Sequence, residues 1–372
     1  MGNIALIDDG ITIFDGIEFN DEMRWIDVMS DVAFVVMDLQ DRNRFDLASR
    51  FLSAYLERTA DYAGLGVLRF YLAYRAMVRA KVACLRASQI GRQSQVDSQQ
   101  TAVASPESSA SSRRPEDAGQ TFWTEYRTYV DLAKRYSEQP HPSIIITHGV
   151  AGSGKTTISQ TLLESCGGLP LSRASADRRS RSRRRLALAR LAVAQGAETA
   201  GLGAVIAVRI RTDVERKRLY GLEAGARSAS PCGGGLYTSA ATEHTYQRVC
   251  ALARLIVDAG DIAIIDGAFL KRWQRDLFRH LASERDVPFV IVACSASGTT
   301  LIERIRARAR LGRDASEADV DVLEHQLATE ERLGSDEHAV TVEYDADVPP
   351  DRALVFWRAV FDRLGSVDLA RH

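Results

Sequence analysis

The spacing of apolar and polar residues divides the chain of 372 residues into three zones. The first zone, residues 1–87, begins with two short β-like runs around Asp8-Asp9-Gly10, a sequence that favours a hairpin turn. Apolar residues then recur every three or four positions, which is the period of an amphipathic helix. We therefore expect a hairpin backed by helices. The predicted strands span 4–7 and 11–14, and the predicted helices span 25–39, 45–56 and 67–85.

The second zone, residues 88–120, is rich in Ser, Gln and Ala and nearly free of large apolar side chains. Such a segment cannot bury enough surface to offset its chain entropy, so we expect a flexible linker. A predicted helix at 121–136 then leads into the third zone. We assign residues 121–372 to one domain and residues 1–87 to another.

In the third zone, β-like and helical runs alternate from Pro142 onwards. Nearly continuous Ile and Val strands separated by amphipathic helices are typical of a parallel sheet covered on both faces. The predicted fold class is therefore α/β with three layers. The expected strands are 143–147, 204–210, 262–265, 289–294 and 340–344, and the expected helices are 155–165, 238–258, 271–284, 299–310 and 316–333.

One motif in this zone points to nucleotide chemistry. Gly149-Val-Ala-Gly-Ser-Gly-Lys-Thr156 fits the phosphate-loop pattern, and it stands between a predicted strand and a predicted helix. Glycines let successive backbone N–H groups point at an anion, and the helix N-terminus adds partial positive charge. We predict an ATP site with Mg²⁺. Its expected nucleotide-binding residues are Gly149, Val150, Ala151, Gly152, Ser153, Gly154, Lys155, Thr156 and Thr157.

The metal site is predicted from the same loop and one further strand. Thr156 is expected to place its hydroxyl on Mg²⁺, and Lys155 to bridge the β- and γ-phosphates. Asp266 ends an apolar strand and is the favoured second metal-side group, although an Asp that caps a strand-to-helix turn is common. His148 directly precedes the loop, and it could equally be a packing residue or a functional residue.

A phosphate loop alone does not distinguish a kinase from a motor or a switch. Asp213 follows the strand 204–210, and Arg216 comes one helical turn later on the same face. In a kinase, Asp213 would accept the proton of an acceptor hydroxyl while Arg216 holds the acceptor or its phosphate. The alternative is a helix-capping Asp213 with an ion pair to Arg216.

Two arginine-rich segments add positive charge. The first, residues 299–313, suits a mobile lid over the phosphates, with Arg310 and Arg313 as the expected contacts and the other arginines solvated. The second, residues 173–190, is either a nucleic-acid or polyphosphate contact or, as we favour, a solvated insertion.

Net charge, hydrophobicity and cysteine content argue against several classes of function. Formal net charge is −1, so no overall field attracts the chain to nucleic acid or a membrane surface. No apolar run is long enough to span a bilayer, and the start lacks the basic region of a signal peptide. Five widely spaced cysteines without a C-x-x-C pair favour a reducing, cytoplasmic setting.

Several blocks of the third zone together resemble one family. THGVAGSGKTT, RTDVERKRLYGL, GLYTSAATEHTYQRV, IAIIDGAFLKRWQRD and RLGRDASEADV are similar to predicted ATP-dependent kinases related to polynucleotide kinase and zeta-toxin-like P-loop kinases. The resemblance runs over most of residues 142–335. It implies that Asp213 and Arg216 match the general base and substrate ligand of the family's D-x-x-R block.

The first zone resembles a different family. GNIALIDDGITIFDGIEFNDEMRWIDVMSDVAFVVMDL is similar to the stretch that follows the catalytic loop in aminoglycoside-phosphotransferase-like kinases. Both halves together resemble bifunctional aminoglycoside phosphotransferase/ATP-binding proteins. The resemblance implies that Asn3 and Asp15 match Mg²⁺ ligands. The chain starts after the position of the catalytic His-Gly-Asp, so we expect a truncated, inert remnant there.

These features favour an ATP-dependent kinase that phosphorylates a hydroxyl of a small molecule or a polynucleotide end. No base-reading motif is visible, so a sequence-specific nucleic-acid partner is not expected. A nucleotide-dependent regulatory or binding ATPase without kinase activity is the main alternative. Aminoglycoside phosphorylation is the least favoured of the three functions, because it requires the catalytic loop that the first zone lacks.

Overall fold

The protein forms two compact units in the computed structural model. The first unit consists of Met1–Arg44 and Val67–Glu138, and the second of Phe45–Gly66 and Gln139–His372. The structure describes residues 4–7, 10–13, 22, 25–101, 115–138, 141–166, 206–228, 230, 234–311, 315–349 and 353–364.

The second unit is built on a five-stranded sheet in the order β4-β5-β3-β6-β7, and every neighbouring pair is parallel. Central strand β3 is buried along its whole length, as its run of isoleucines predicts. The strands are β3 (Ser143–His148), β4 (Ala207–Arg211), β5 (Ile262–Asp266), β6 (Phe289–Ser295) and β7 (Thr341–Asp345).

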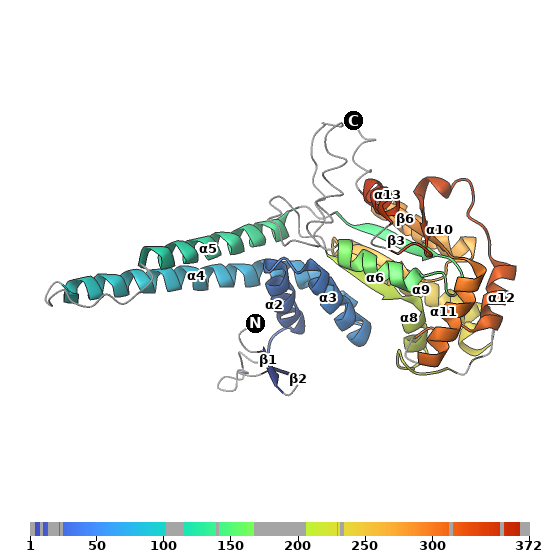
Figure 1. The fold of residues 1–372 in the computed structure, drawn as a ribbon, viewed down its shortest axis with the longest axis horizontal. Coiled ribbons are helices and arrows are strands. Elements are labelled where there is room, and N and C mark those ends of the chain that lie inside the picture. Colours follow the sequence, from blue (N-terminus) through green and yellow to red (C-terminus); the bar gives the residue numbers. More distant parts are fainter. Residues whose placement is uncertain are drawn as a thin grey trace. The chain divides into compact units, whose positions relative to one another are not determined.

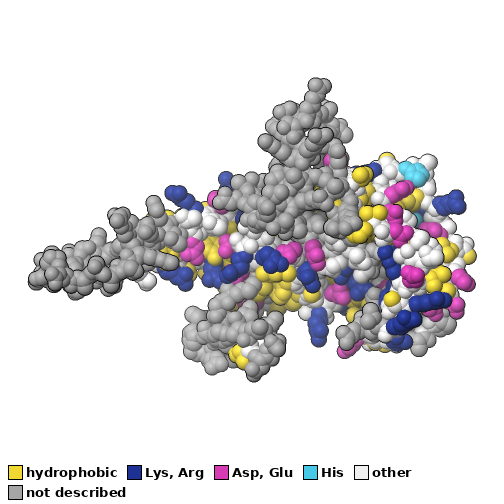
Figure 2. All heavy atoms as spheres, viewed as in Figure 1, with side chains coloured by type: hydrophobic (Ala, Val, Ile, Leu, Met, Phe, Trp, Pro, Cys, Tyr) yellow, Lys and Arg dark blue, Asp and Glu magenta, His cyan; other side chains and the backbone are white. Residues whose placement is uncertain are grey.

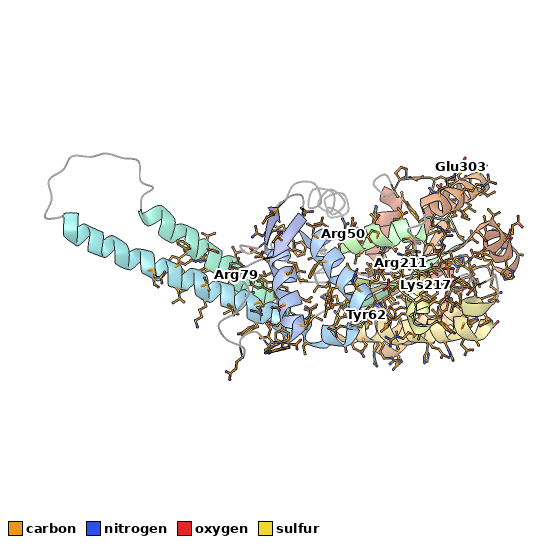
Figure 3. All side chains as sticks on the ribbon, turned by 90° about the horizontal axis from the view of Figure 1, so that it is seen from below. Arg50, Tyr62, Arg79, Arg211, Lys217 and Glu303 are labelled. Carbon is orange, nitrogen blue, oxygen red and sulfur yellow. The ribbon has the colours of Figure 1, made fainter. Side chains whose placement is uncertain are left out.

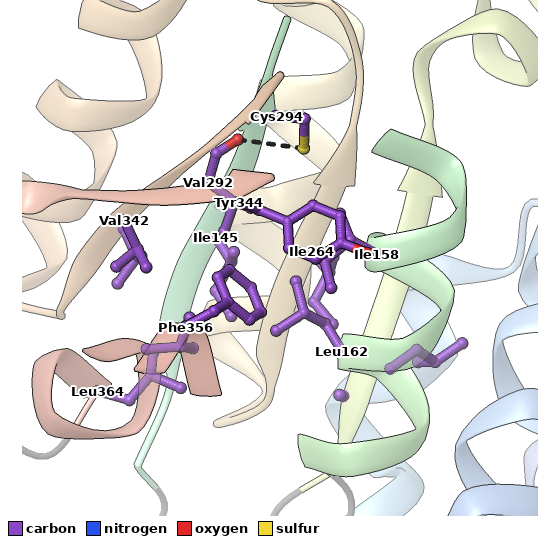
Figure 4. Close-up of a cluster of buried hydrophobic side chains, with 14 of the residues drawn as sticks. Ile145, Ile158, Leu162, Ile264, Val292, Cys294, Val342, Tyr344, Phe356 and Leu364 are labelled. Atoms are coloured by element: carbon purple, nitrogen blue, oxygen red, sulfur yellow. Dashed lines mark hydrogen bonds between the residues drawn. The ribbon is translucent and has the colours of Figure 1, made fainter. Parts of the chain in front are cut away.

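Helices cover both faces of this sheet, which confirms the predicted three-layer α/β fold (Figure 1). One face packs against α6 and α13, where Ile145, Ile158 and Phe356 belong to one buried cluster (Figure 4). The other face packs against α9 and α10. The helices of this unit are α3 (Phe45–Thr59), α6 (Lys155–Cys166), α8 (Thr212–Leu219), α9 (Ser239–Asp258), α10 (Arg272–Arg285), α11 (Gly298–Leu311), α12 (Val320–Thr329) and α13 (Leu354–Leu364), with the 3-10 turns η1 (Tyr62–Gly64), η2 (Gly235–Tyr237) and η3 (His338–Val340).

The first unit contains the expected hairpin and long helices. Strands β1 (Ile4–Ile7) and β2 (Gly10–Ile13) pair antiparallel. The helices are α2 (Val28–Asp41), α4 (Leu65–Thr101) and α5 (Pro115–Ser137). The buried Tyr136 hydroxyl donates to Gln40 Oε1 at 2.6 Å, so α5 is tied to α2 by a satisfied polar contact.

The division into units differs from the expected boundary at residue 87. Helix α3 and η1 come from the first zone of the sequence, yet they pack in the second unit, against α6, β4 and α9. Tyr62 of η1 (labelled in Figure 3) is buried, and this burial, with the nearby Glu215 charge of α8, raises the pKa of its hydroxyl well above the ordinary value. Periodicity predicts the helix but carries no information about which sheet it packs against.

The expected linker at 88–120 is also largely helical in the structure. Helix α4 continues to Thr101, and α5 begins at Pro115. No proline interrupts α4, and Gln, Arg and Ala are good helix formers, so a helix can continue where a core cannot form. Pro115 takes the first helical position, where its missing N–H costs nothing. Residues 102–114 lie outside the described part.

The basic run 173–190, the implied metal ligands Asn3 and Asp15, and the expected lid residue Arg313 lie outside the described part of the chain. Within the described part, no helix is both long and apolar enough to cross a membrane. On the face of the second unit seen in Figure 2, basic and acidic side chains are intermixed.

Candidate nucleotide and phosphoryl-transfer site

The phosphate loop occupies residues 149–154, between the carboxyl end of β3 and the N-terminus of α6. Gly149, Gly152 and Gly154 have φ angles of +139°, +82° and +85°. Side chains rarely adopt this backbone region, and a Cβ on Gly152 would stand 2.8 Å from the Leu301 carbonyl oxygen. The glycines are therefore required both by conformation and by the close approach of α11.

Lys155 begins α6 and folds back over the loop. Its Nζ donates to the Val150 carbonyl at 2.6 Å. Burial lowers the pKa of Lys155, while the charges of Asp266 and Asp213 act in the opposite direction. The ammonium therefore lies at the loop, within the electrostatic reach of both carboxylates. This is where a lysine that contacts nucleotide phosphates is needed.

The two predicted metal-side groups, Thr156 and Asp266, lie next to each other. Thr156 Oγ1 is 3.4 Å from Asp266 Oδ1. Asp266 is buried, and its Oδ2 has no hydrogen-bond partner among the described residues, although Arg211 Nε lies 3.8 Å away. A hydroxyl and an under-satisfied carboxylate are ligands that suit Mg²⁺, which takes one or two protein groups and completes its shell with water and phosphates.

Parallel pairing brings these groups together. Strand β5 lies directly between β3 and β4, and Arg211 at the end of β4 stands opposite Asp266 at the end of β5. Thr212 Oγ1 donates to the Asp266 carbonyl at 3.2 Å, so the start of α8 is attached to the metal-side strand. Ligands of open parallel sheets bind at such carboxyl ends.

Asp213 lies in the first turn of α8 and is half-buried. Neither of its carboxylate oxygens has a hydrogen bond or ion pair to any residue that the structure describes. The N-cap of the helix is Arg211, and it makes no side-chain capping bond. The capping arrangement that the sequence left open for Asp213 is therefore not formed, and the unpaired carboxylate acts by its charge on Lys155 and Tyr237.

Arg216 is buried, and among the described residues it forms no ion pair with Asp213. Its Nη1 donates to the Leu236 carbonyl at 2.8 Å and to Thr242 Oγ1 at 3.2 Å, and its guanidinium lies 5.2 Å from the centre of the Tyr237 ring. Burial and the Asp213 charge raise the pKa of Tyr237 to about 12. Sequence reasoning did not single out Tyr237, because an aromatic residue in a glycine-rich turn has no distinctive spacing.

Helix α11 also brings an arginine to the phosphate loop that was not singled out from the sequence. Arg304 Nη1 lies 3.4 Å from the Gly152 carbonyl, and its Nη2 donates to the Ala346 carbonyl at 2.7 Å. Arg310 is exposed and has no partner in the described part of the chain, and Arg313 lies outside that part. Arg304 is three residues after buried Leu301 and therefore lies on the face of α11 that packs toward the loop. Arg310 lies on another face of the same helix.

Helix α12 contributes contacts that sequence reasoning missed. Gln326 Oε1 accepts the Ala151 backbone N–H at 2.7 Å. One turn later, Glu330 Oε1 lies 3.2 Å from His148 Nε2, and His148 Nδ1 lies 3.0 Å from the Phe269 carbonyl. Burial lowers the pKa of His148, and these two partners oppose that shift. His148 therefore connects β3 to the loop after β5 and to α12.

A fully buried ion pair holds the loop after β5. Arg275 donates to Glu337 at 2.7 and 3.1 Å and to the Phe269 carbonyl at 3.0 Å, and both charged side chains are inaccessible to solvent. A buried pair is tolerated only when its groups are hydrogen-bonded in this way. The pair fixes Phe269, whose φ of +51° places it in the left-handed region.

The AAA domain family matches residues 188–333, which is less than half of the chain. The matched region includes Asp213, Arg216 and Asp266 and does not include the phosphate loop.

The chain is also similar to uncharacterized proteins of Mycobacterium tuberculosis and Mycobacterium bovis. Each is 28% identical over 316 residues, covering 84% of this chain and 50% of the relative. The chain thus spans about half the length of the curated relatives it matches.

The solved structures that are similar at low identity include two nucleotide complexes. Kti12 of Chaetomium thermophilum in complex with ADP-AlF3 is 14% identical with a TM-score of 0.39, covering 59% of this chain and 98% of that one. The APS kinase CysC of Mycobacterium tuberculosis in complex with AMPPNP and APS is 16% identical with a TM-score of 0.35, covering 60% and 98%. The parallel sheet, the phosphate loop and the carboxylate beside it identify a nucleotide-binding protein with a three-layer P-loop fold.

Proposed function

We propose that this chain is an ATP-dependent kinase that transfers the γ-phosphoryl group to a hydroxyl of a small molecule or a polynucleotide end. The observation that carries the proposal is the unpaired carboxylate of Asp213, which lies within electrostatic reach of Lys155. Arg216, which contacts the Tyr237 ring, and Tyr237, whose pKa is raised by burial and by the Asp213 charge, further support an acceptor site near that carboxylate.

Each residue has a distinct role in the proposed reaction. Lys155 contacts the β- and γ-phosphates, and Thr156 with Asp266 holds Mg²⁺, which neutralises phosphate charge when bound. Asp213 accepts the proton of the acceptor hydroxyl. At the same time the acceptor oxygen bonds to the γ-phosphorus, and the bond between the γ-phosphorus and the bridging oxygen that leaves with ADP breaks. Arg216, a buried cation without a carboxylate partner in the described part of the chain, suits an acceptor that carries an anionic group.

The test is a transfer assay with labelled ATP and a panel of sugars, nucleosides and 5′-hydroxyl oligonucleotides. With the acceptor that responds, Asp213→Asn should lower kcat by about 10²–10⁴ while ADP affinity stays unchanged, because only the base is lost. Asp258→Asn, at an exposed position on α9, is the matched control.

Full transfer activity in Asp213→Asn would remove Asp213 from its role. Nucleotide binding without transfer to any acceptor would instead favour the alternative function, a nucleotide-dependent regulatory protein. The aminoglycosides belong in the acceptor panel, because the first zone resembles their phosphotransferases.

A further inference from the structure

Helix α12 presents two polar side chains to the phosphate-loop strand. Gln326 and Glu330 are four residues apart and therefore lie on one face of the helix. Gln326 bonds the Ala151 N–H, and Glu330 contacts His148, the residue just before the loop. The Glu331 backbone N–H also donates to the Leu270 carbonyl at 2.9 Å. The end of α12 is thus fixed at three points: to the phosphate loop at Ala151, to the end of β3 at His148, and to the loop after β5 at Leu270.

The chemistry of the Ala151 contact determines how the Gln326 amide is oriented. A backbone N–H is only a donor, so the side-chain oxygen of Gln326 must face it, and the NH₂ group must point elsewhere. The oxygen and nitrogen of an amide are about 2.2 Å apart. Because Oε1 is 2.7 Å from Ala151 N, the NH₂ group lies within about 5 Å of the loop backbone.

The two N–H donors of that NH₂ group have no hydrogen-bond partner among the residues that the structure describes, and the Gln326 side chain is half-buried. Solvent satisfies such donors in part, so their exposure alone decides nothing. Their position is informative because a donor held by a rigid anchor next to a phosphate loop costs little entropy when it binds an oxyanion.

The Lys155 contact identifies which phosphate this part of the loop would face. Lys155 Nζ donates to the Val150 carbonyl, so the ammonium lies beside the residue that precedes Ala151. A phosphate-loop lysine contacts the β- and γ-phosphates, whereas the amides nearer the helix hold the α- and β-phosphates. Val150 and Ala151 therefore mark the side of the loop where the terminal phosphate binds.

We propose that Gln326 is a binding residue for the terminal phosphate: its oxygen is anchored by Ala151, and its NH₂ group donates to the γ-phosphate of a bound nucleoside triphosphate. This inference rests on the nucleotide site of the proposed function. It gives α12 a role in distinguishing a triphosphate from a diphosphate, since ADP lacks the group that Gln326 binds.

The test compares Mg²⁺·AMP-PNP with Mg²⁺·ADP by titration calorimetry on the full chain. Gln326→Glu keeps an oxygen for the Ala151 N–H but replaces the donors with a negative charge, and Gln326→Ala removes both. A hydrogen bond to a charged group is worth about 1.5–3 kcal/mol, which corresponds to roughly 10–150-fold in affinity. Both variants should lose about tenfold or more for AMP-PNP and stay within about twofold for ADP.

Glu324→Gln, an exposed position on the same helix, is the matched control, and thermal melting of each variant verifies folding. An equal loss for both nucleotides would show that Gln326 only supports the loop, and unchanged AMP-PNP affinity would also overturn the inference. Failure of the proposed function is distinguishable from failure of this inference. A wild-type chain that transfers phosphate to no acceptor can still show the AMP-PNP effect, whereas binding of neither nucleotide rejects both.

Discussion

At the scale of single residues, the glycines of the phosphate loop are the most constrained positions in the site. Gly149 combines a φ of +139° with a backbone neighbour, the Cys294 carbonyl, where a Cβ would stand. Backbone cannot move aside as the end of a flexible side chain can. Gly66, in the first turn of α4, has no atom within 4 Å of its Cβ position and no positive φ. The two glycines therefore respond to substitution in opposite directions.

We expect Gly149→Ala to lower the free energy of unfolding by about 1–3 kcal/mol, because it strains the backbone. The same change should abolish measurable binding of Mg²⁺·ADP, because the loop can no longer close around phosphate. Gly66→Ala is the control and should stabilise by about 0.5–1 kcal/mol through the lower entropy of the unfolded chain. Urea unfolding and calorimetry measure both effects, and normal ADP affinity in Gly149→Ala would contradict the prediction.

At the scale of elements, helix α3 protects the edge of the sheet that carries the candidate base. Strand β4 is the edge strand, and the unpaired amides of such a strand must be covered. The Arg209 N–H of β4 donates to Ser53 Oγ at 3.2 Å, and Ser53 is buried. On the outer face of α8, the Arg218 guanidinium donates to the Glu57 carbonyl of α3. Helix α3 thus supports the strand and the helix that position Asp213.

Ser53→Ala should therefore destabilise this unit by about 1–3 kcal/mol, because it removes a buried acceptor from the Arg209 amide. Hydrogen exchange of the β4 amides should be faster in the variant, as measured by mass spectrometry of peptides spanning residues 206–211. Arg58→Ala, exposed on the same helix, should change neither quantity. Unchanged protection of β4 in Ser53→Ala would show that the helix does not secure the edge.

At the scale of the whole molecule, the phosphate-loop unit is discontinuous in sequence. It combines Phe45–Gly66 with the chain from Gln139 onwards. The earlier segment buries Leu52, Leu56 and Tyr62 completely or nearly so. Burial of each such side chain is worth about 1.5–3 kcal/mol, and a domain has only about 5–15 kcal/mol of net stability. Loss of this segment is therefore large enough to unfold the unit.

A chain that starts at residue 45 should bind Mg²⁺·ADP with the affinity of the full chain, since it keeps α3 and η1. A chain that starts at residue 121 should aggregate or fail to bind, because the edge of β4 and the α3-facing side of α6 become exposed. Size-exclusion chromatography and calorimetry compare the two. A soluble chain from residue 121 with full ADP affinity would show that α3 is dispensable.

Much of the fold was predictable from local sequence. Five predicted strands lie within a few residues of the observed ones, because runs of Ile and Val between amphipathic helices have few alternatives to a parallel sheet. The phosphate loop was predictable for the same reason, since glycines, Lys155 and Thr156 are contiguous. Helix α13 was not predicted. The extent of α4 was underestimated, because a composition poor in apolar residues indicates that a segment is not buried but does not indicate whether it is helical.

The sequence by itself determined the sheet class, the phosphate loop and the two carboxylates, Asp213 and Asp266, that follow neighbouring strands. Tertiary structure decided which distant groups join them: Arg304 at the loop, Gln326 on the Ala151 amide, and α3 on the edge of β4. The physical reason is that motifs and periodicity record neighbours along the chain. A contact between residues more than 150 positions apart, such as Arg304 and Gly152, depends on how the helices pack.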